Sequence, residues 1–297
     1  HNMGEGHPER PARMDAVEQA LQTEGLAGRL VRRNAERATL DCIGLMHPQK
    51  YIEQIVASVP SSGVTRLDAD TCLSPGSLEA ALRAVGAACS AVDEVILGES
   101  KNAFCAVRPP GHHAETNKAM GFCIFNTVAI AAAYARQKYG VERVAVIDFD
   151  VHHGNGTQEM FWSDQNLLFA STHQMPLYPG TGSKNERGEF DNIVNCPLIE
   201  GDGSSEFRAA ISDVILPGLV TFQPDLLLVS AGFDAHMNDP LAGLNLQDDD
   251  YAWVTKQLLE IADKFTNGRL ISTLEGGYDL SALSSSVASH VEELLQV

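Results

Sequence analysis

The stretch Val144-Ala-Val-Ile-Asp-Phe-Asp-Val-His-His-Gly-Asn-Gly156 decides the fold class and locates the chemistry. Its four leading apolar residues are typical of a strand that is buried on both faces, and acidic and imidazole side chains follow where that strand ends. Side chains alternate along an extended chain, so Asp148, Asp150 and His152 are predicted to project to one side. The two apolar residues between them project to the other. Three potential metal ligands therefore share one side of a strand end.

Further apolar runs alternate with helical patterns along the chain. The runs predicted as strands are 103–107, 144–147, 167–170, 225–230 and 270–274. The predicted helices cover 125–139, open at 74–75 and open at 248–250. Buried strands separated by helices indicate a parallel sheet covered on both faces. Ligands bind such sheets at the carboxyl ends of the strands, so the polar clusters that follow the runs are the candidate site.

Composition excludes several classes of protein. The 297 residues are 44% hydrophobic and 20% charged, which fits a packed globular chain rather than a disordered one. The net charge of −18 disfavours direct binding to nucleic acid, because a phosphate backbone would be repelled. The same charge fits a cationic substrate, and equally ordinary solubility. No apolar run approaches the roughly 18 residues of a membrane span.

The six cysteines predict a reducing compartment. None is spaced as CxxC and most lie in apolar runs, as expected of buried thiols, so we expect a cytoplasmic protein. The first residues do not resemble a signal peptide. There is no internal repeat and no long linker, and we therefore treat residues 1–297 as one domain.

A second strand end offers a further ligand. The run 225–230 is followed by Ala231-Gly-Phe-Asp-Ala-His236, in which Asp234 could complete an Asp-His-Asp set. Oxygen and nitrogen ligands without a thiolate suit Zn²⁺, with Fe²⁺, Co²⁺ or Mn²⁺ as alternatives. Three protein ligands leave an open position, as catalytic metal sites do. The alternative is a hydrogen-bonded polar strand end without an ion.

Two more polar segments follow strands. In Arg108-Pro-Pro-Gly-His-His-Ala-Glu115, the tandem histidines are either a solvated surface pair or a general base and acid. In Glu275-Gly-Gly-Tyr278, the paired glycines permit close backbone approach, and the tyrosine either packs or donates a hydrogen bond to an oxyanion. Aromatic and apolar residues at 121–123, 177–180 and 239–241 either pack these loops or line a narrow passage.

Taken together, these motifs resemble the histone deacetylase superfamily, in particular its class II branch and the bacterial histone deacetylase-like amidohydrolases. The resemblance runs from Gly6-His-Pro-Glu-Arg-Pro-Ala-Arg13 to the last strand. It implies a single arginase-like α/β domain, with a mainly parallel sheet of about eight strands and helices on both faces. The short strand that usually opens this fold has no counterpart before His1, so the edge of the sheet is in question.

The resemblance also implies a catalytic centre with one zinc ion per chain. The implied zinc ligands are Asp150, His152 and Asp234. The implied catalytic residues are the base and acid pair His112 and His113, their partners Asp148 and Asn155, and the carbonyl-polarising Tyr278. Because Asn155 carries no charge, we expect His113 to protonate less readily than His112 beside Asp148.

Further sites are implied around this centre. A potassium ion is implied at Asp148, the backbone of Asp150 and His152, Ser171 and Thr172. A second, weaker monovalent site is implied around Phe161, Asp164 and Leu167. The implied walls of a tunnel for the acyl-lysine side chain are Gly121, Phe122 and Tyr178, with Leu241 at the rim and Arg13 behind the zinc.

The predicted function is a zinc-dependent amidohydrolase that removes acetyl or other short acyl groups from N-epsilon-acyl-lysine in peptides or proteins, or from similar small amines. The nearest alternative is an acetylpolyamine amidohydrolase, although Leu241 is not the acidic gatekeeper of that branch. A ureohydrolase with two Mn²⁺ ions would need an additional Asp where His236 stands. A catalytically silent acyl-lysine binding module is the remaining alternative. The sequence predicts no oligomeric state.

Overall fold

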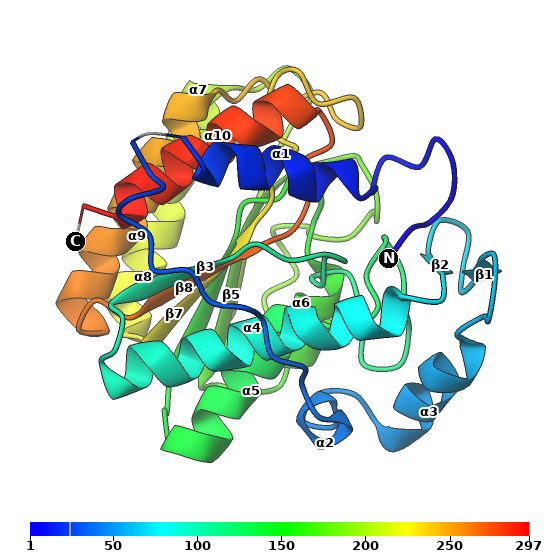
Figure 1. Ribbon diagram of the computed structural model, residues 1–297. Coiled ribbons are helices and arrows are strands. Elements are labelled where there is room, and N and C mark those ends of the chain that lie inside the picture. Colours follow the sequence, from blue (N-terminus) through cyan, green and yellow to red (C-terminus); the bar gives the residue numbers. More distant parts are fainter. Residues whose placement is uncertain (24, 297) are drawn as a thin grey trace.

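A parallel sheet forms the centre of the fold (Figure 1). The structure is a computed structural model and describes residues 1–23 and 25–296. The strand order of the sheet is β3-β8-β7-β4-β5-β6, and every pair is parallel. The strands are β3 (Asn102–Cys105), β4 (Val144–Asp148), β5 (Leu167–Gln174), β6 (Ile193–Leu198), β7 (Leu226–Ala231) and β8 (Leu270–Leu274). The predicted mainly parallel α/β class is confirmed.

The main sheet has six strands in the described residues, fewer than the eight or so implied by the resemblance. The two remaining strands, β1 (Thr65–Arg66) and β2 (Cys72–Leu73), are two residues long and pair antiparallel with each other. They lie apart from the sheet, near the N-terminus (Figure 1). The sheet is therefore narrower than expected, with β3 and β6 at its edges.

Helices cover both faces of the sheet (Figure 1). One face is covered by α4 (Ser77–Leu97) and α5 (Thr127–Tyr139), which pack on Val144 and Val146 of β4. The other face packs Ala145 and Ile147 against α1 (Ala12–Leu21), α7 (Ser204–Ala210), α8 (Leu216–Phe222), α9 (Asp248–Phe265) and α10 (Leu280–Leu294). A π-helical turn, Ile211–Ile215, joins α7 to α8. A third apolar cluster lies beneath α2 (Leu40–Ile43) and α3 (Gln49–Ser58).

Local sequence signals explain where the helices begin and end. The side chain of Asn126 accepts a hydrogen bond from the Ala129 N–H and so caps α5, which ends at Gly140 in the left-handed region. Helix α9 begins at Asp248 as predicted, with three aspartates in its first turn that favour the positive end of the helix dipole. Helix α4 begins at Ser77, slightly later than the predicted opening at 74–75.

The topology explains why the site forms where it does. Strand β4 lies between β7 and β5, and the chain winds outward in opposite directions from this point. Asp148, the last residue of β4, lies opposite Ser230 of β7 and Ser171 of β5. The loops that follow β4 and β7 therefore emerge side by side at a topological switch point, the preferred ligand site of such sheets.

No helix within the described residues is long and apolar enough to cross a membrane.

Candidate metal centre and catalytic site

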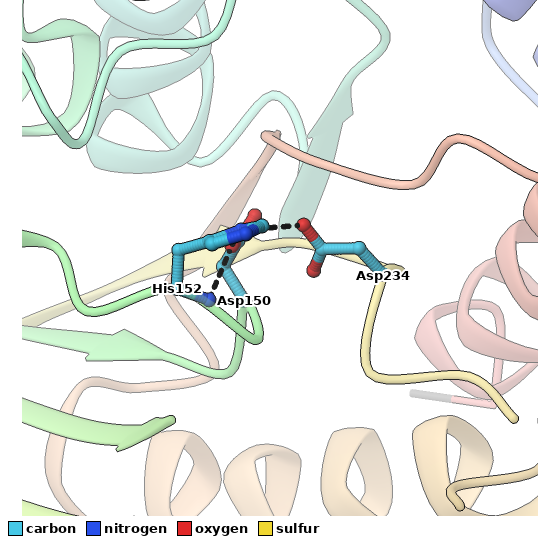
Figure 2. A group of neighbouring side chains, drawn as sticks. All are labelled: Asp150, His152 and Asp234. Carbon is cyan, nitrogen blue, oxygen red and sulfur yellow. Dashed lines mark hydrogen bonds and ion pairs between the residues drawn. The ribbon is translucent and has the colours of Figure 1, made fainter. Parts of the chain in front are cut away.

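Three ligand-type side chains converge at the carboxyl ends of β4 and β7 (Figure 2). Asp150 and His152 follow β4, and Asp234 follows β7. One ligand atom from each lies within 4.8 Å of the others, and all three residues are buried. His152 Nδ1 lies 3.2 Å from Asp150 Oδ1 and 3.1 Å from Asp234 Oδ2. The structure thus brings together the three predicted metal ligands, although β4 ends at Asp148 and the ligands lie in the loop beyond it.

Backbone groups hold the two carboxylates in place. The Val151 N–H donates to Asp234 Oδ1 at 2.8 Å, and the Gly276 N–H donates to Asp150 Oδ2 at 2.8 Å. A Cβ atom at Gly276 would lie 2.1 Å from Asp234 Oδ2, so only glycine lets the backbone approach this closely. The spacing of the carboxylates is therefore fixed by the fold.

The charge of this cluster fits a cation. Burial alone would lower the pKa of His152, but its hydrogen bonds with the two aspartates raise that pKa to about 10. Burial and the neighbouring Asp150 raise the pKa of Asp234. The two buried carboxylates thus favour a positive charge beside them, here on the protonated His152 ring. A divalent cation would supply such a positive charge instead. Two oxygen ligands and one nitrogen ligand suit a metal such as zinc.

The tandem histidines lie beside the ligand cluster and differ in their partners. His112 Nδ1 lies 2.9 Å from Asp148 Oδ2, whereas His113 Nδ1 lies 2.8 Å from the amide oxygen of Asn155. The two rings are 4.0 Å apart. His112 Nε2 lies 3.8 Å from Asp150 Oδ1, which connects the pair to the metal ligands.

The two rings differ in proton affinity as the sequence predicts. Burial alone would lower the pKa of His112, but the charges of Asp148 and Asp150 raise it well above its usual value. Burial lowers the pKa of His113 well below its usual value, and the neighbouring positive charge of His112 lowers it further. One ring is therefore suited to carry a proton and the other to accept one.

Glu275 positions the histidine loop, a role that sequence reasoning did not assign. Its Oε2 accepts hydrogen bonds from the Gly111 N–H at 2.6 Å and the His112 N–H at 3.2 Å. The Ser230 hydroxyl donates to its Oε1 at 3.1 Å. The available signal was the position of Glu275 directly after β8, where a polar side chain falls at the ligand end of the sheet.

Tyr278 lies two residues beyond Gly276, whose N–H binds the metal-ligand candidate Asp150. Its ring is 5.9 Å from that of Phe122, and the Arg13 guanidinium lies 5.0 Å from its centre. Its hydroxyl makes no hydrogen bond within residues 1–23 and 25–296. Burial raises the pKa of Tyr278, so the hydroxyl stays protonated and available as a donor.

Arg13 and Glu9 form a buried ion pair next to the Tyr278 segment. Arg13 donates to the carbonyl oxygens of Glu275 and Gly277, each at 2.6 Å. Glu9 pairs with Arg13 and also with Arg108, which precedes the histidine loop. The family resemblance implies Arg13 behind the zinc, but no local pattern indicates the Glu9–Arg108 pair, because its members are 99 positions apart.

The residues predicted to line a tunnel lie near the histidines and Tyr278. The ring of Tyr178 packs edge-on against His113 at 5.2 Å and is 37% exposed. Phe122 adopts a left-handed backbone, with its N–H bonded to the Thr71 hydroxyl. A Cβ atom at Gly121 would lie 2.3 Å from the His113 ring, so glycine is required there. Leu241 is half-buried in the loop after β7.

The predicted potassium ligands also gather near β4. Ser171 lies opposite Asp148 in the sheet, and Thr172 follows it, buried. His173 Nε2 lies 2.9 Å from the Gly182 carbonyl and must donate to it, so its Nδ1 accepts from the Ser171 hydroxyl. That arrangement leaves the Ser171 oxygen free to bind a cation.

The second, weaker monovalent site around Phe161, Asp164 and Leu167 stays a prediction. The side-chain nitrogen of Asn192 donates to the three carbonyl oxygens that would bind that ion. These belong to Phe161 at 2.8 Å, Asp164 at 3.2 Å and Leu167 at 2.8 Å. In this structure the Asn192 amide thus binds these three carbonyl oxygens, because three converging acceptors suit an NH₂ group as well as an ion.

Comparisons with known proteins identify the family to which this chain belongs. The histone deacetylase domain family matches residues 7–294. An uncharacterized protein of Synechocystis is 43% identical, over 99% of this chain and 96% of its own length. The histone deacetylase-like amidohydrolase of Pseudomonas aeruginosa is 37% identical, over 97% of this chain and 77% of its own length. The crystal structure of the HDA15 HD domain aligns with a TM-score of 0.92 at 35% identity, covering 97% of this chain and 82% of that one.

The fold and the buried cluster define an α/β protein with a candidate metal centre at the carboxyl ends of its strands. The chain belongs to the histone deacetylase family. This is a family of deacetylases and amidohydrolases, and membership implies an acetylated substrate.

Proposed function

We propose that residues 1–297 form one zinc-dependent deacetylase domain, which removes acetyl or other short acyl groups from N-epsilon-acyl-lysine or similar amines. The observation that carries the proposal is the buried Asp-His-Asp cluster with the His112–His113 pair beside it. Ligands and a proton-transfer pair within one buried site are what metal-assisted amide hydrolysis requires.

Asp150, His152 and Asp234 would hold one zinc ion per chain. When bound, the metal would lower the pKa of a coordinated water and polarise the amide carbonyl. The donor set supports this assignment, and iron, cobalt or manganese would suit the same ligands. Asp148, Ser171 and Thr172, with the backbone of Asp150 and His152, would hold a potassium ion nearby.

His113 and His112 take different roles in this mechanism. His113 is the better proton acceptor at neutral pH, because its partner Asn155 is uncharged. We assign it the removal of the proton from the attacking water and the later transfer of that proton to the leaving amine. His112, paired with Asp148, keeps its proton and stabilises negative charge that develops beside it.

Tyr278 donates a hydrogen bond to the substrate oxygen as it gains negative charge. Support comes from its protonated hydroxyl, which has no hydrogen-bond partner among the residues that the structure describes. Phe122 and Tyr178, with Gly121 leaving room beside His113, would line the path of an extended acyl-lysine side chain, and Leu241 would lie at its rim. Leu241 supplies no carboxylate to bind a polyamine, so we favour acyl-lysine over acetylpolyamine substrates. All six cysteines are free thiols, which supports a cytoplasmic location.

The test is turnover of an acetyl-lysine reporter by zinc-loaded protein, compared with acetylputrescine. We expect activity on the lysine substrate that is lost in His113→Ala and strongly reduced in Tyr278→Phe. Higher catalytic efficiency on acetylputrescine would favour the polyamine alternative. Binding of an acyl-lysine peptide with no turnover in metal-replete protein would favour a silent binding module.

A further inference from the structure

Asp239 is a buried carboxylate that the mechanism above does not use. It lies in the loop after β7, five residues beyond Asp234, and is 7% exposed. Its Oδ2 accepts a hydrogen bond from the Tyr278 N–H at 2.7 Å and a longer one from the Asp279 N–H at 3.4 Å. Its Oδ1 accepts from the Leu241 N–H at 3.0 Å. One side chain thus binds both the Tyr278 segment and the proposed tunnel rim.

The Tyr278 segment makes further hydrogen bonds, one of them from the loop that carries Asp239: the Phe233 N–H donates to the Gly276 carbonyl at 3.0 Å. Arg13 binds the carbonyl oxygens of Glu275 and Gly277, and Asp150 binds the Gly276 N–H. These contacts hold the segment up to Gly277, whose φ of 121° gives the chain a bend that only glycine adopts readily. Beyond that bend, the Asp239 carboxylate binds the Tyr278 N–H, and the next residue, Asp279, caps α10 by accepting from the Ala282 N–H at 2.8 Å.

We propose that Asp239 is a positioning residue, which holds the Tyr278 hydroxyl at the distance needed to reach the substrate oxygen and ties Leu241 to the same anchor. This inference rests on the proposed function. The three hydrogen-bond partners of the carboxylate among the described residues are backbone N–H groups, so both of its oxygens must act as acceptors. An amide of the same shape has one acceptor oxygen, and its NH₂ group would face either Tyr278 or Leu241 as donor against donor.

A double-mutant cycle separates positioning from general stability. Asp239→Asn should lower kcat by about 10- to 100-fold with little change in KM, because small displacements of a catalytic group cost about this much. In a Tyr278→Phe background the same substitution should change kcat by less than about threefold, since the hydroxyl it positions is gone. An equal loss in both backgrounds would overturn the inference.

Asp250→Asn is the matched control. Asp250 is fully buried and also binds a backbone N–H, that of Gln247, but it pairs with Arg208 in a different part of the structure. Its substitution should leave kcat within about twofold, and a loss as large as that of Asp239→Asn would contradict a specific role.

Amide hydrogen exchange tests the same contacts without turnover. Asp239→Asn should speed exchange at Tyr278 and Leu241, whereas Asp250→Asn should not. Unchanged exchange at both amides in Asp239→Asn would overturn the positioning role of Asp239 but not the proposed function. Absence of turnover in the unaltered, metal-loaded protein would contradict the proposed function instead, so the two failures are distinguishable.

Discussion

Replacing Asn155 by aspartate should move the acidic limb of the pH–rate profile to higher pH. His113 Nδ1 lies 2.8 Å from the Asn155 oxygen, so the substitution puts a carboxylate in direct contact with the proposed proton acceptor. Burial and the positive charge of His112 lower the pKa of His113 in the unaltered chain. The proton acceptor must be neutral, so activity is lost as pH falls through this pKa. A raised pKa therefore shifts that loss upward.

The neighbouring pair of His112 and Asp148 indicates how far the pKa of His113 should rise in this variant. His112 and Asp148 meet at 2.9 Å in the same buried site, and carboxylates there raise the pKa of that ring well above its usual value. Two unit charges about 4 Å apart interact by about 4 kcal/mol at an effective dielectric constant of about 20. Burial of the new carboxylate opposes part of this gain, so we expect a net shift of about 1–3 pH units.

The experiment needs one compensating change. The Asn155 side-chain nitrogen donates to Glu115 Oε1 at 2.8 Å, and a carboxylate at 155 would instead repel Glu115. The combined variant Asn155→Asp with Glu115→Gln restores a donor, and Glu115→Gln alone is the control. Stopped-time assays of kcat/KM from pH 5 to pH 10 should show the acidic limb displaced in the combined variant. An unmoved acidic limb, or a shift confined to the alkaline limb, would refute the assignment of His113 as proton acceptor.

Three further outcomes are expected. Tyr278→Phe should lower kcat by about 10²- to 10³-fold while the free energy of unfolding stays within about 0.5 kcal/mol, and denaturant titration showing a large stability loss would contradict this. Burial lowers the pKa of His290 to about 3, below its value of about 6.5 in the unfolded chain. The free energy of unfolding should therefore decrease between pH 6.5 and pH 3, by up to about 1.4 kcal/mol per pH unit, because only the unfolded chain binds the proton in this range. In urea titrations, His290→Gln should remove this contribution to the pH dependence. Cation counting by atomic emission should find one potassium ion per chain, and a second only after Asn192→Ala; two ions in the unaltered protein would count against the role given to that amide.

The sequence predicts the centre of this fold better than its margins. The continuous apolar run of β4 predicted both the parallel sheet and the side on which the ligands project, and Phe149 and Val151 do pack in the opposite core. Strand β6 was not predicted, because Asn195 and Pro197 interrupt its apolar pattern. An edge strand can tolerate such residues since one side needs no partner.

The residues of the candidate site also differ in whether the sequence alone could predict them. Residues directly after apolar strands, such as Asp150 and Asp234, could be predicted because the carboxyl ends of parallel strands meet. Glu9 and Asp239 could not be assigned from sequence, because Arg108 lies 99 positions from Glu9 and the partners of Asp239 are backbone N–H groups placed by the folded loops. The amide of Asn192 at the expected second cation site likewise depends on a contact across 25 to 31 residues.

Metal titration of stripped protein tests the central claim most directly. Deacetylase activity should rise linearly with added zinc and reach its plateau at one ion per chain, and a variant carrying both Asp150→Ala and Asp234→Ala should bind no ion at that site and show no turnover. Full activity in chelator-treated protein, or in that double variant, would contradict the account.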